Sequence, residues 1–302
     1  MHYARVLAAV AATPWAIEPN KGRAVAEFLS RKAAGQTVPQ ADIDAAVAAR
    51  REPSAGRPAK NVAVVPIYGV LTQRADLVME YSGGTSADET GRIIDALAAD
   101  PRVDVIVLDV DSPGGSVAGI PELAARVAAA REVKKVIAVA NAVAASAAYW
   151  IASQASELIV TPSGMVGSIG VFTMHVDRSK SMETAGVAVT LVSAGELKTD
   201  GNEFQPLSAT ARESMQRIVD GYYEPFVRDV AKGRGATPGA VRAGFGRGDM
   251  VLARDAVKEG MADRVATLDE VLARYAGGGA VAARAADDRH AAEARRRRMK
   301  LS

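Results

Sequence analysis

The chain has no cysteine, and only three of its 302 residues are histidine. Disulfides, a thiolate nucleophile and cysteine-based metal sites are therefore excluded. With so few histidines we expect no metal centre, and nothing in the sequence indicates a cofactor. Aromatic residues make up only 5% of the chain, so we expect a core built from Ala, Val, Ile and Leu.

The sequence also lacks a long hydrophobic run and a strong charge of one sign. No stretch approaches the length of a membrane span, about 18 consecutive apolar residues, and the apolar start at residues 5–12 favours an amphipathic helix over a signal peptide. Residues 280–302 carry seven basic and three acidic side chains, so within the net charge of +2 this tail is +4 and the remainder −2. We therefore expect a cytoplasmic protein with no membrane partner and no specific nucleic-acid partner.

Composition shifts divide the chain into three segments. Residues 1–58 are expected to form an N-terminal helical arm or removable pro-segment, with helices over 21–34 and 40–51 and a linker over 53–58. Residues 59–276 are expected to form the main domain. Residues 277–302 begin with three consecutive glycines and predict a disordered basic tail.

Within the main domain, apolar runs alternate with amphipathic stretches. Strands are expected over 62–71, 104–110, 136–140, 158–160 and 187–192. Helices are expected over 87–99, 118–130, 147–153, 208–232, 253–260 and 268–275, with a capping box of Thr210 and Glu213 and a kink or new segment at Pro225. This alternation predicts an α/β fold with a largely parallel sheet.

The run Ala144–Trp150 places Ser146 among small residues, where a strand gives way to a helix. A nucleophilic serine needs this setting, because small neighbours admit a substrate carbonyl and a helix N-terminus offers unpaired N–H groups to an oxyanion. The simpler interpretation is an ordinary helix N-cap. Asp111–Gly115 likewise follows a buried strand, and its two glycines suit either an oxyanion hole or a tight strand-to-helix turn.

A nucleophilic serine also needs a base. Histidine is the usual choice, but only His175 lies within the core segment, and no acidic partner for it stands out. Lysine is the alternative, provided that desolvation lowers its pKa by several units. Lys198 follows the apolar run 187–192 and is a candidate, and Ser168 in a glycine-rich turn could orient it.

The ordered motifs Asp-Ser-Pro-Gly-Gly, Ala-Ala-Ser-Ala-Ala-Tyr, Gly-Ser-Ile-Gly-Val and Ser-Ala-Gly-Glu-Leu-Lys resemble the signal peptide peptidase A family of serine peptidases. The resemblance covers Val62–Leu272. It implies the fold of the ClpP/crotonase superfamily, a spiral of ββα units. It also implies Ser146 as nucleophile, Lys198 as general base, Ser168 as the residue that positions the lysine, and the N–H groups of Gly115 and Ala147 as oxyanion donors. The segment 253–263 resembles the closing segment of the family, which is structural.

Two features depart from the membrane members of this family. Ala147-Ala148 replaces their Gly-Gly, and we expect no N-terminal membrane anchor. The start Thr13–Ile17 and the stretch Lys198–Ser208 resemble the tailed-phage branch, which are capsid assembly (head maturation) proteases. The resemblance then implies a homo-oligomer acting on phage scaffold, capsid or portal proteins, in the host cytoplasm or the procapsid.

The sequence thus predicts a Ser-Lys endopeptidase, whose lysine is supplied either by the same subunit or by a neighbour. Two alternatives stay open. One is a cytoplasmic bacterial peptidase of the same family that degrades peptide fragments, and the other is a scaffold or assembly protein with vestigial chemistry. A crotonase-type acyl-CoA enzyme is disfavoured, because Ser146, Ser168 and Lys198 together have no role there.

Overall fold

The structure is a computed structural model that describes residues 14–19, 21, 23, 27, 61–74 and 84–275. The helices expected over 21–34 and 40–51, the linker over 53–58 and the basic tail lie outside the described residues, apart from three single positions in the first helix. Over the described chain, no helix is both long and apolar enough to cross a membrane.

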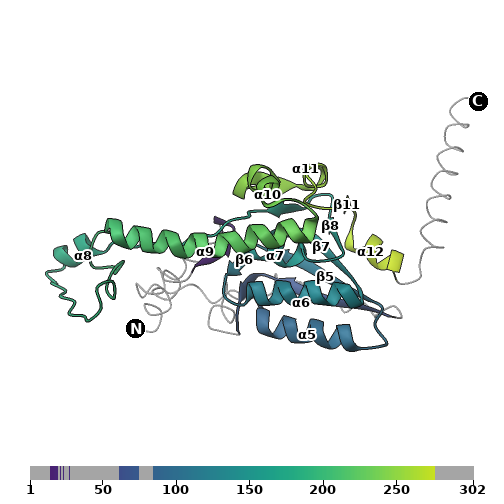
Figure 1. Cartoon of the computed structure of the whole chain (residues 1–302), viewed down its shortest axis with the longest axis horizontal. Coiled ribbons are helices and arrows are strands. Elements are labelled where there is room, and N and C mark those ends of the chain that lie inside the picture. The colour runs from purple at the N-terminus through teal and green to yellow at the C-terminus, as the bar shows by residue number, and fades with distance from the viewer. Residues whose placement is uncertain are drawn as a thin grey trace, which may run out of the picture.

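A seven-stranded sheet forms the centre of the molecule (Figure 1). Every strand pair in it is parallel except the pair formed by β10 and β9. This confirms the predicted α/β class with a largely parallel sheet. The members are β2 (Val62–Tyr68), β5 (Val105–Ser112), β7 (Lys135–Ala145), β8 (Glu157–Val160), β9 (Met165–Gly167), β10 (Met250–Leu252) and β11 (Arg264–Val265).

A second, smaller sheet has the order β1-β6-β3-β4. Its members are β1 (Trp15–Ile17), β3 (Val70–Thr72), β4 (Gly84–Ser86) and β6 (Gly114–Ser116). The chain alternates between the sheets. Strand β2 is followed by β3 and β4 and then by helix α5 (Ala87–Ala99), and β5 is followed by β6 and then by helix α6 (Ile120–Val133). These are the ββα repeats that the family resemblance implies.

Helices cover both faces of the large sheet. Alternate residues of β5 point to opposite faces, so Ile106 and Leu108 join the main core while Val105 and Val107 join a second cluster that includes Val271. The helices are α5 (Ala87–Ala99), α6 (Ile120–Val133), α7 (Ala147–Ala152), α8 (Ser179–Thr184), α9 (Ala209–Arg234), α10 (Pro238–Ala243), the 3-10 helix η1 (Phe245–Gly248), α11 (Ala253–Lys258) and α12 (Leu268–Tyr275).

Helix α9 packs its C-terminal half tightly on α7. Phe226 stacks on Trp150 with ring centroids 4.5 Å apart, and the Trp150 indole N–H donates to Asp229 at 2.9 Å. A Cβ built on Gly233 would lie 2.2 Å from the Ser153 carbonyl oxygen, so only glycine permits this approach. The helix behind Ser146 is therefore held by α9.

The start and the interior of α9 differ in detail from the sequence prediction. Ser208 is the N-cap and accepts from the Ala211 N–H at 3.0 Å, so Thr210 lies inside the first turn. The helix also continues through Pro225 rather than starting a new segment there. Gly221, whose carbonyl loses its partner at Pro225, is exposed, so water can satisfy it.

The strand expected over 187–192 is wrong. These residues form no strand, and they lie in a stretch, residues 176–208, in which no residue is buried. We call residues 176–208 the extension; with α8 and the start of α9 it projects from the body (Figure 1). The apolar run Val187–Val192 resembled a buried strand in composition, but none of its residues belongs to the hydrophobic core of the described chain, and Val192 is 94% exposed.

Candidate active site

Ser146 lies where β7 ends and α7 begins, and its backbone is held in a rare conformation. Its φ of +53° and ψ of −118° are costly for a residue with a side chain. Ser146 is the N-cap of α7 by position, and its carbonyl accepts from the Trp150 N–H, but its side chain makes no cap hydrogen bond, so capping does not account for the serine hydroxyl. Strained backbone of this kind at a strand-to-helix turn is typical of serine nucleophiles, because it presents the hydroxyl at the turn.

The turn after β9 lies directly beside Ser146. The Ser146 N–H donates to the Gly167 carbonyl at 2.7 Å, and its hydroxyl donates to the Gly170 carbonyl at 3.4 Å. Ser168 lies between these two contacts, is buried, and has a positive φ of +53° fixed by its N–H bond to Asp249. The structure thus brings Ser168 to Ser146.

Strand β6 lines the other side of Ser146. A Cβ built on Gly114 would lie 3.0 Å from the Ser146 Cβ, and one built on Gly115 would lie 1.9 Å from the Leu71 carbonyl oxygen. Both glycines are therefore required by close approach of neighbouring atoms. Ala147, the first residue of α7, is fully buried, and an N–H at this position has no acceptor within its helix. Gly115 and Ala147 as oxyanion donors stay predictions that this arrangement suits.

Lys198 is not part of this cluster in the single chain. It lies in the extension, its side chain is exposed, and no hydrogen bond joins it to Ser146 or Ser168 within the described residues. His175 also lies apart, where its ring contacts the Asn202 carbonyl oxygen at 3.0 Å. Within one subunit, the predicted nucleophile Ser146 thus lies beside Ser168 and beside the segments that carry the proposed oxyanion donors. The predicted base, Lys198, does not join them.

The sequence reasoning missed the part of the site that β1 forms. Residues 15–17 come from the segment expected to be an arm, yet they pair with β6 and are buried. Only the resemblance of Thr13–Ile17 to the phage branch pointed to them. Among the described residues, no group of three or more His, Asp or Glu side chains could hold a metal ion.

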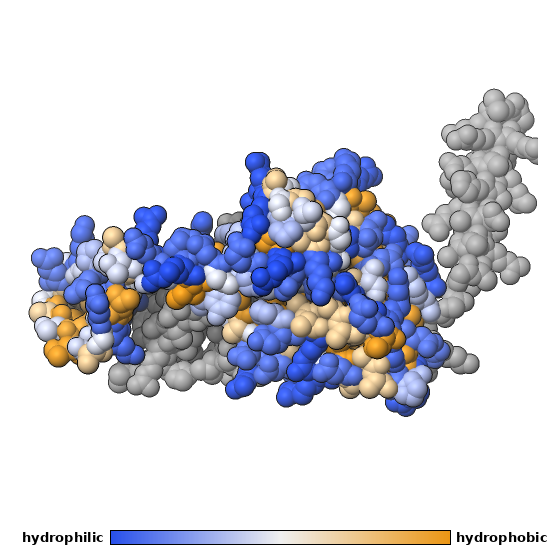
Figure 2. Space-filling view, viewed as in Figure 1, coloured by the Kyte–Doolittle hydropathy of each residue, from blue (hydrophilic) through white to orange (hydrophobic). Residues whose placement is uncertain are grey.

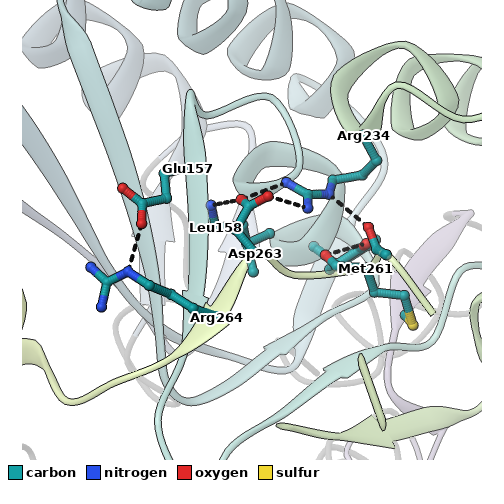
Figure 3. A network of polar contacts seen from close by, with 8 residues as sticks. Glu157, Leu158, Arg234, Met261, Asp263 and Arg264 are labelled. Atoms are coloured by element: carbon teal, nitrogen blue, oxygen red, sulfur yellow. Dashed lines mark hydrogen bonds and ion pairs between the residues drawn. The ribbon is translucent and has the colours of Figure 1, made fainter. Parts of the chain in front are cut away.

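A polar network behind α7 fixes the closing segment of the fold (Figure 3). Arg234, at the end of α9, donates two bonds to the Asp263 carboxylate at 2.8 and 3.0 Å and one to the Gly260 carbonyl. Asp263 also accepts from the Leu158 N–H, and the Tyr149 hydroxyl of α7 donates to the Met261 carbonyl at 2.9 Å. Burial raises the pKa of Tyr149, so its phenol stays protonated and donates.

The ion pair in this network predicts an acid-sensitive contribution to stability. Burial alone would raise the pKa of Asp263, but bonds from Arg234 and Leu158 outweigh it and lower that pKa. The stabilisation is therefore present above the unfolded pKa near 3.8 and is lost as pH falls through the folded value. We expect Arg234→Met to lower the free energy of unfolding by about 2 kcal/mol at pH 7, a figure held down by the partial exposure of Asp263.

Urea unfolding at pH 7 and pH 3 measures this effect, and the difference from wild type should shrink at pH 3. Arg242→Met is the matched control, because Arg242 and Glu224 are both exposed and their pair is worth less than about 1 kcal/mol. An equal loss at both pH values would show that the Asp263 charge is not involved.

Comparisons with known proteins place the chain among peptidases. The profile of peptidase family S49 matches residues 128–282, which include Ser146, Ser168 and Lys198. The chain is 35% identical over 250 residues to the head-tail preconnector protein GP5 of Enterobacteria phage P21, covering 78% of this chain and 50% of that protein. It is 38% identical over 170 residues to capsid assembly protease C of Escherichia phage lambda, covering 56% and 39%.

Cellular proteins match as well. Protease 4 of Salmonella typhi is 33% identical over 198 residues, covering 65% of this chain and 32% of that protein. The chain thus spans half or less of the length of these relatives. Among solved structures, the 1510-N membrane protease from Pyrococcus horikoshii has a TM-score of 0.43 at 18% identity over 72% of this chain and 79% of its own. The family match covers half of the sequence and the whole of the Ser146 region, and the chain belongs to peptidase family S49.

Proposed function

We propose that the chain is a serine endopeptidase in which Ser146 is the nucleophile and Lys198 the general base. The observation that carries the proposal is the strained backbone of Ser146, which lies between two glycine-rich segments and whose side chain makes no cap hydrogen bond. Strain at a small polar residue persists where the surrounding structure enforces it, and such positions cluster at active sites. Membership of a peptidase family supports the same assignment.

The proposed reaction follows from the positions of these groups. The neutral Lys198 amine takes the Ser146 proton as the oxygen attacks the peptide carbonyl, and the Gly115 and Ala147 N–H groups stabilise the oxyanion. The lysine ammonium then protonates the leaving amine, which gives an acyl-enzyme. Water, deprotonated by the lysine, hydrolyses the ester and restores the serine. Ser168 would hold the amine in position.

This chemistry requires that Lys198 reach a serine, and a second subunit can supply the contact. The extension that carries Lys198 exposes apolar side chains, which gather at its tip (Figure 2). They are Val187, Val189, Leu191, Val192 and Leu197. An exposed apolar patch of this kind marks an interface. We therefore propose a homo-oligomer in which the extension of one subunit covers the Ser146 region of the next and removes water from the lysine amine.

The proposed substrates are phage scaffold, capsid or portal proteins. Two relatives with this sequence region carry the names head-tail preconnector protein and capsid assembly protease, which supports a role in assembling a phage head. The match to protease 4 keeps a cellular peptidase as the second candidate. A role as vestigial scaffold would require that Ser146 be unreactive.

Labelling with a fluorophosphonate tests the nucleophile. We expect the full chain to form one covalent adduct, which mass spectrometry places on Ser146, since only an activated serine reacts readily with this reagent. Ser153, the C-cap of the same short helix, is buried and its hydroxyl donates to the Trp150 carbonyl, so Ser153→Ala is the matched control and should leave labelling intact. An assembled sample without adduct would count against Ser146 as an activated nucleophile.

A further inference from the structure

Strand β1 fills a position between the two segments that flank Ser146. On one side it runs antiparallel to β6, with Glu18 N–H bonded to the Pro113 carbonyl at 2.7 Å and Val117 N–H to the Pro14 carbonyl at 3.2 Å. On the other side Trp15 and Phe172 exchange both backbone bonds, at 2.9 and 3.0 Å. We call this position, between β6 and residues 170–172, the strand site.

Ala16 lies at the centre of the strand site, opposite Gly115. Hydrogen-bonded pairs recur at every second residue of an antiparallel ladder, and the bonds at Glu18 and Pro14 fix the phase. Ala16 and Gly115 are therefore such a pair, and the N–H of Gly115 faces the Ala16 carbonyl. A Cβ built on Gly114 would lie 2.2 Å from that carbonyl oxygen and 3.0 Å from the Ser146 Cβ. The Ala16 carbonyl oxygen and the Ser146 side chain therefore both lie next to Gly114.

A peptide substrate would have to make these same contacts. Extended peptides bind to proteases and other domains by adding a strand to a sheet edge, with main-chain bonds for affinity and side-chain sites for specificity. The carbonyl to be cleaved must meet the oxyanion donors beside the serine. In this structure an Ala16 carbonyl already meets the proposed donor, and Ser146 is 1% exposed.

We infer that the strand site is where the substrate binds, and that β1 occupies it as a built-in competitor, so the chain is autoinhibited until β1 leaves. The inference rests on the proposed function of Ser146. The substrate strand that replaces β1 carries a small residue at the place of Ala16, because Ala16 is fully buried and a larger side chain there would overpack the core.

A reversible lock of β1 tests the inference. Trp15→Cys with Phe172→Cys places two cysteines on a hydrogen-bonded antiparallel pair, where Cα atoms are about 5.5 Å apart, a separation that suits a disulfide. The chain has no other cysteine, so no native thiol competes. The double serine variant is the control, and its behaviour should not change on oxidation.

The readout is binding of a fluorescent peptide of residues 13–18 to the full chain carrying Ser146→Ala, followed by anisotropy. We expect oxidation of the locked variant to weaken peptide binding at least tenfold and reduction to restore it. In the Ser146 background, oxidation should slow fluorophosphonate labelling to a similar degree. Equal peptide binding in the oxidised and reduced forms would overturn the inference. If peptide binding weakens on oxidation and recovers on reduction, but Ser146 never reacts with fluorophosphonate, the proposed hydrolase is refuted while the strand site is supported.

A single substitution gives an independent check should the locked variant fail to fold. Trp15→Ala removes a buried side chain from β1 and weakens its docking. If β1 competes with substrate, the variant binds the peptide more tightly and reacts faster with fluorophosphonate. If β1 only completes the small sheet, its loss lowers both quantities, and the inference fails.

Discussion

Replacing Lys198 by alanine should lower kcat/KM for peptide cleavage by about 10⁴-fold or more, because the serine then has no base to take its proton. The matched control is Lys180→Ala. Lys180 lies in the same extension and is also exposed, so its loss removes the same charge without the proposed chemistry. Similar losses for both variants would indicate that the charge of the extension matters and that a specific base does not.

Mixing two inactive variants separates a shared site from one within a subunit. A Lys198→Ala subunit keeps its serine, and a Ser146→Ala subunit keeps its lysine. If the extension serves a neighbour through one repeated interface, random co-assembly at equal amounts restores about a quarter of the sites. If each subunit uses its own lysine, the mixture stays inactive. Co-refolding of the two chains, followed by active-site titration with fluorophosphonate, measures this fraction.

Replacing Gly233 by alanine should lower the free energy of unfolding by about 3 kcal/mol, since the new methyl would lie against a backbone carbonyl that cannot turn aside. The built Cβ meets the Ser153 carbonyl oxygen at 2.2 Å, and Gln154 Nε2 at 2.8 Å. The clash pushes α9 away from α7 and separates the Trp150–Phe226 stack. Labelling of Ser146 should weaken with it, because Ser146 immediately precedes α7.

Gly221→Ala in the same helix is the control for this prediction. A Cβ at Gly221 meets nothing within 4 Å, so alanine there should stabilise the helix by about 1 kcal/mol through its better helix propensity. Urea unfolding of both variants compares the two glycines directly. Stabilisation by both substitutions would mean that α7 and α9 do not approach closely at Gly233.

The strands and helices of the body could be predicted because each has a strong local pattern. The runs at Val105–Val110 and Val136–Ala140 are buried throughout, and the stripe at Phe226, Val227 and Val230 lies in the main core. The placing of Ser146 beside Ser168 and Gly115 followed from motif order, which the family resemblance supplied.

The predictions for Val187–Val192 and for β1 failed because a local sequence pattern does not identify the partner of a segment. An apolar run indicates that a segment avoids water, but it does not indicate which surface covers the segment. The composition of Val187–Val192 therefore predicted a strand of this chain's own sheet, although none of these residues is buried in the structure. Conversely, β1 is three residues long, and its partners Gly114–Ser116 and Phe172 are distant in sequence, so no local pattern could place it.

Helix α9 has a mechanical consequence. It is a single rod of 26 residues, about 39 Å long, that starts at the extension and ends at the Arg234–Asp263 pair. A force on the N-terminal end of α9 would be transmitted along the helix to the stack of Phe226 on Trp150, and Trp150 lies one helical turn after Ser146. In the proposed assembly, a neighbour that docks on the extension would therefore be coupled through this helix to the backbone behind the hydroxyl, and Pro225, with its missing hydrogen bond, is where that coupling is weakest.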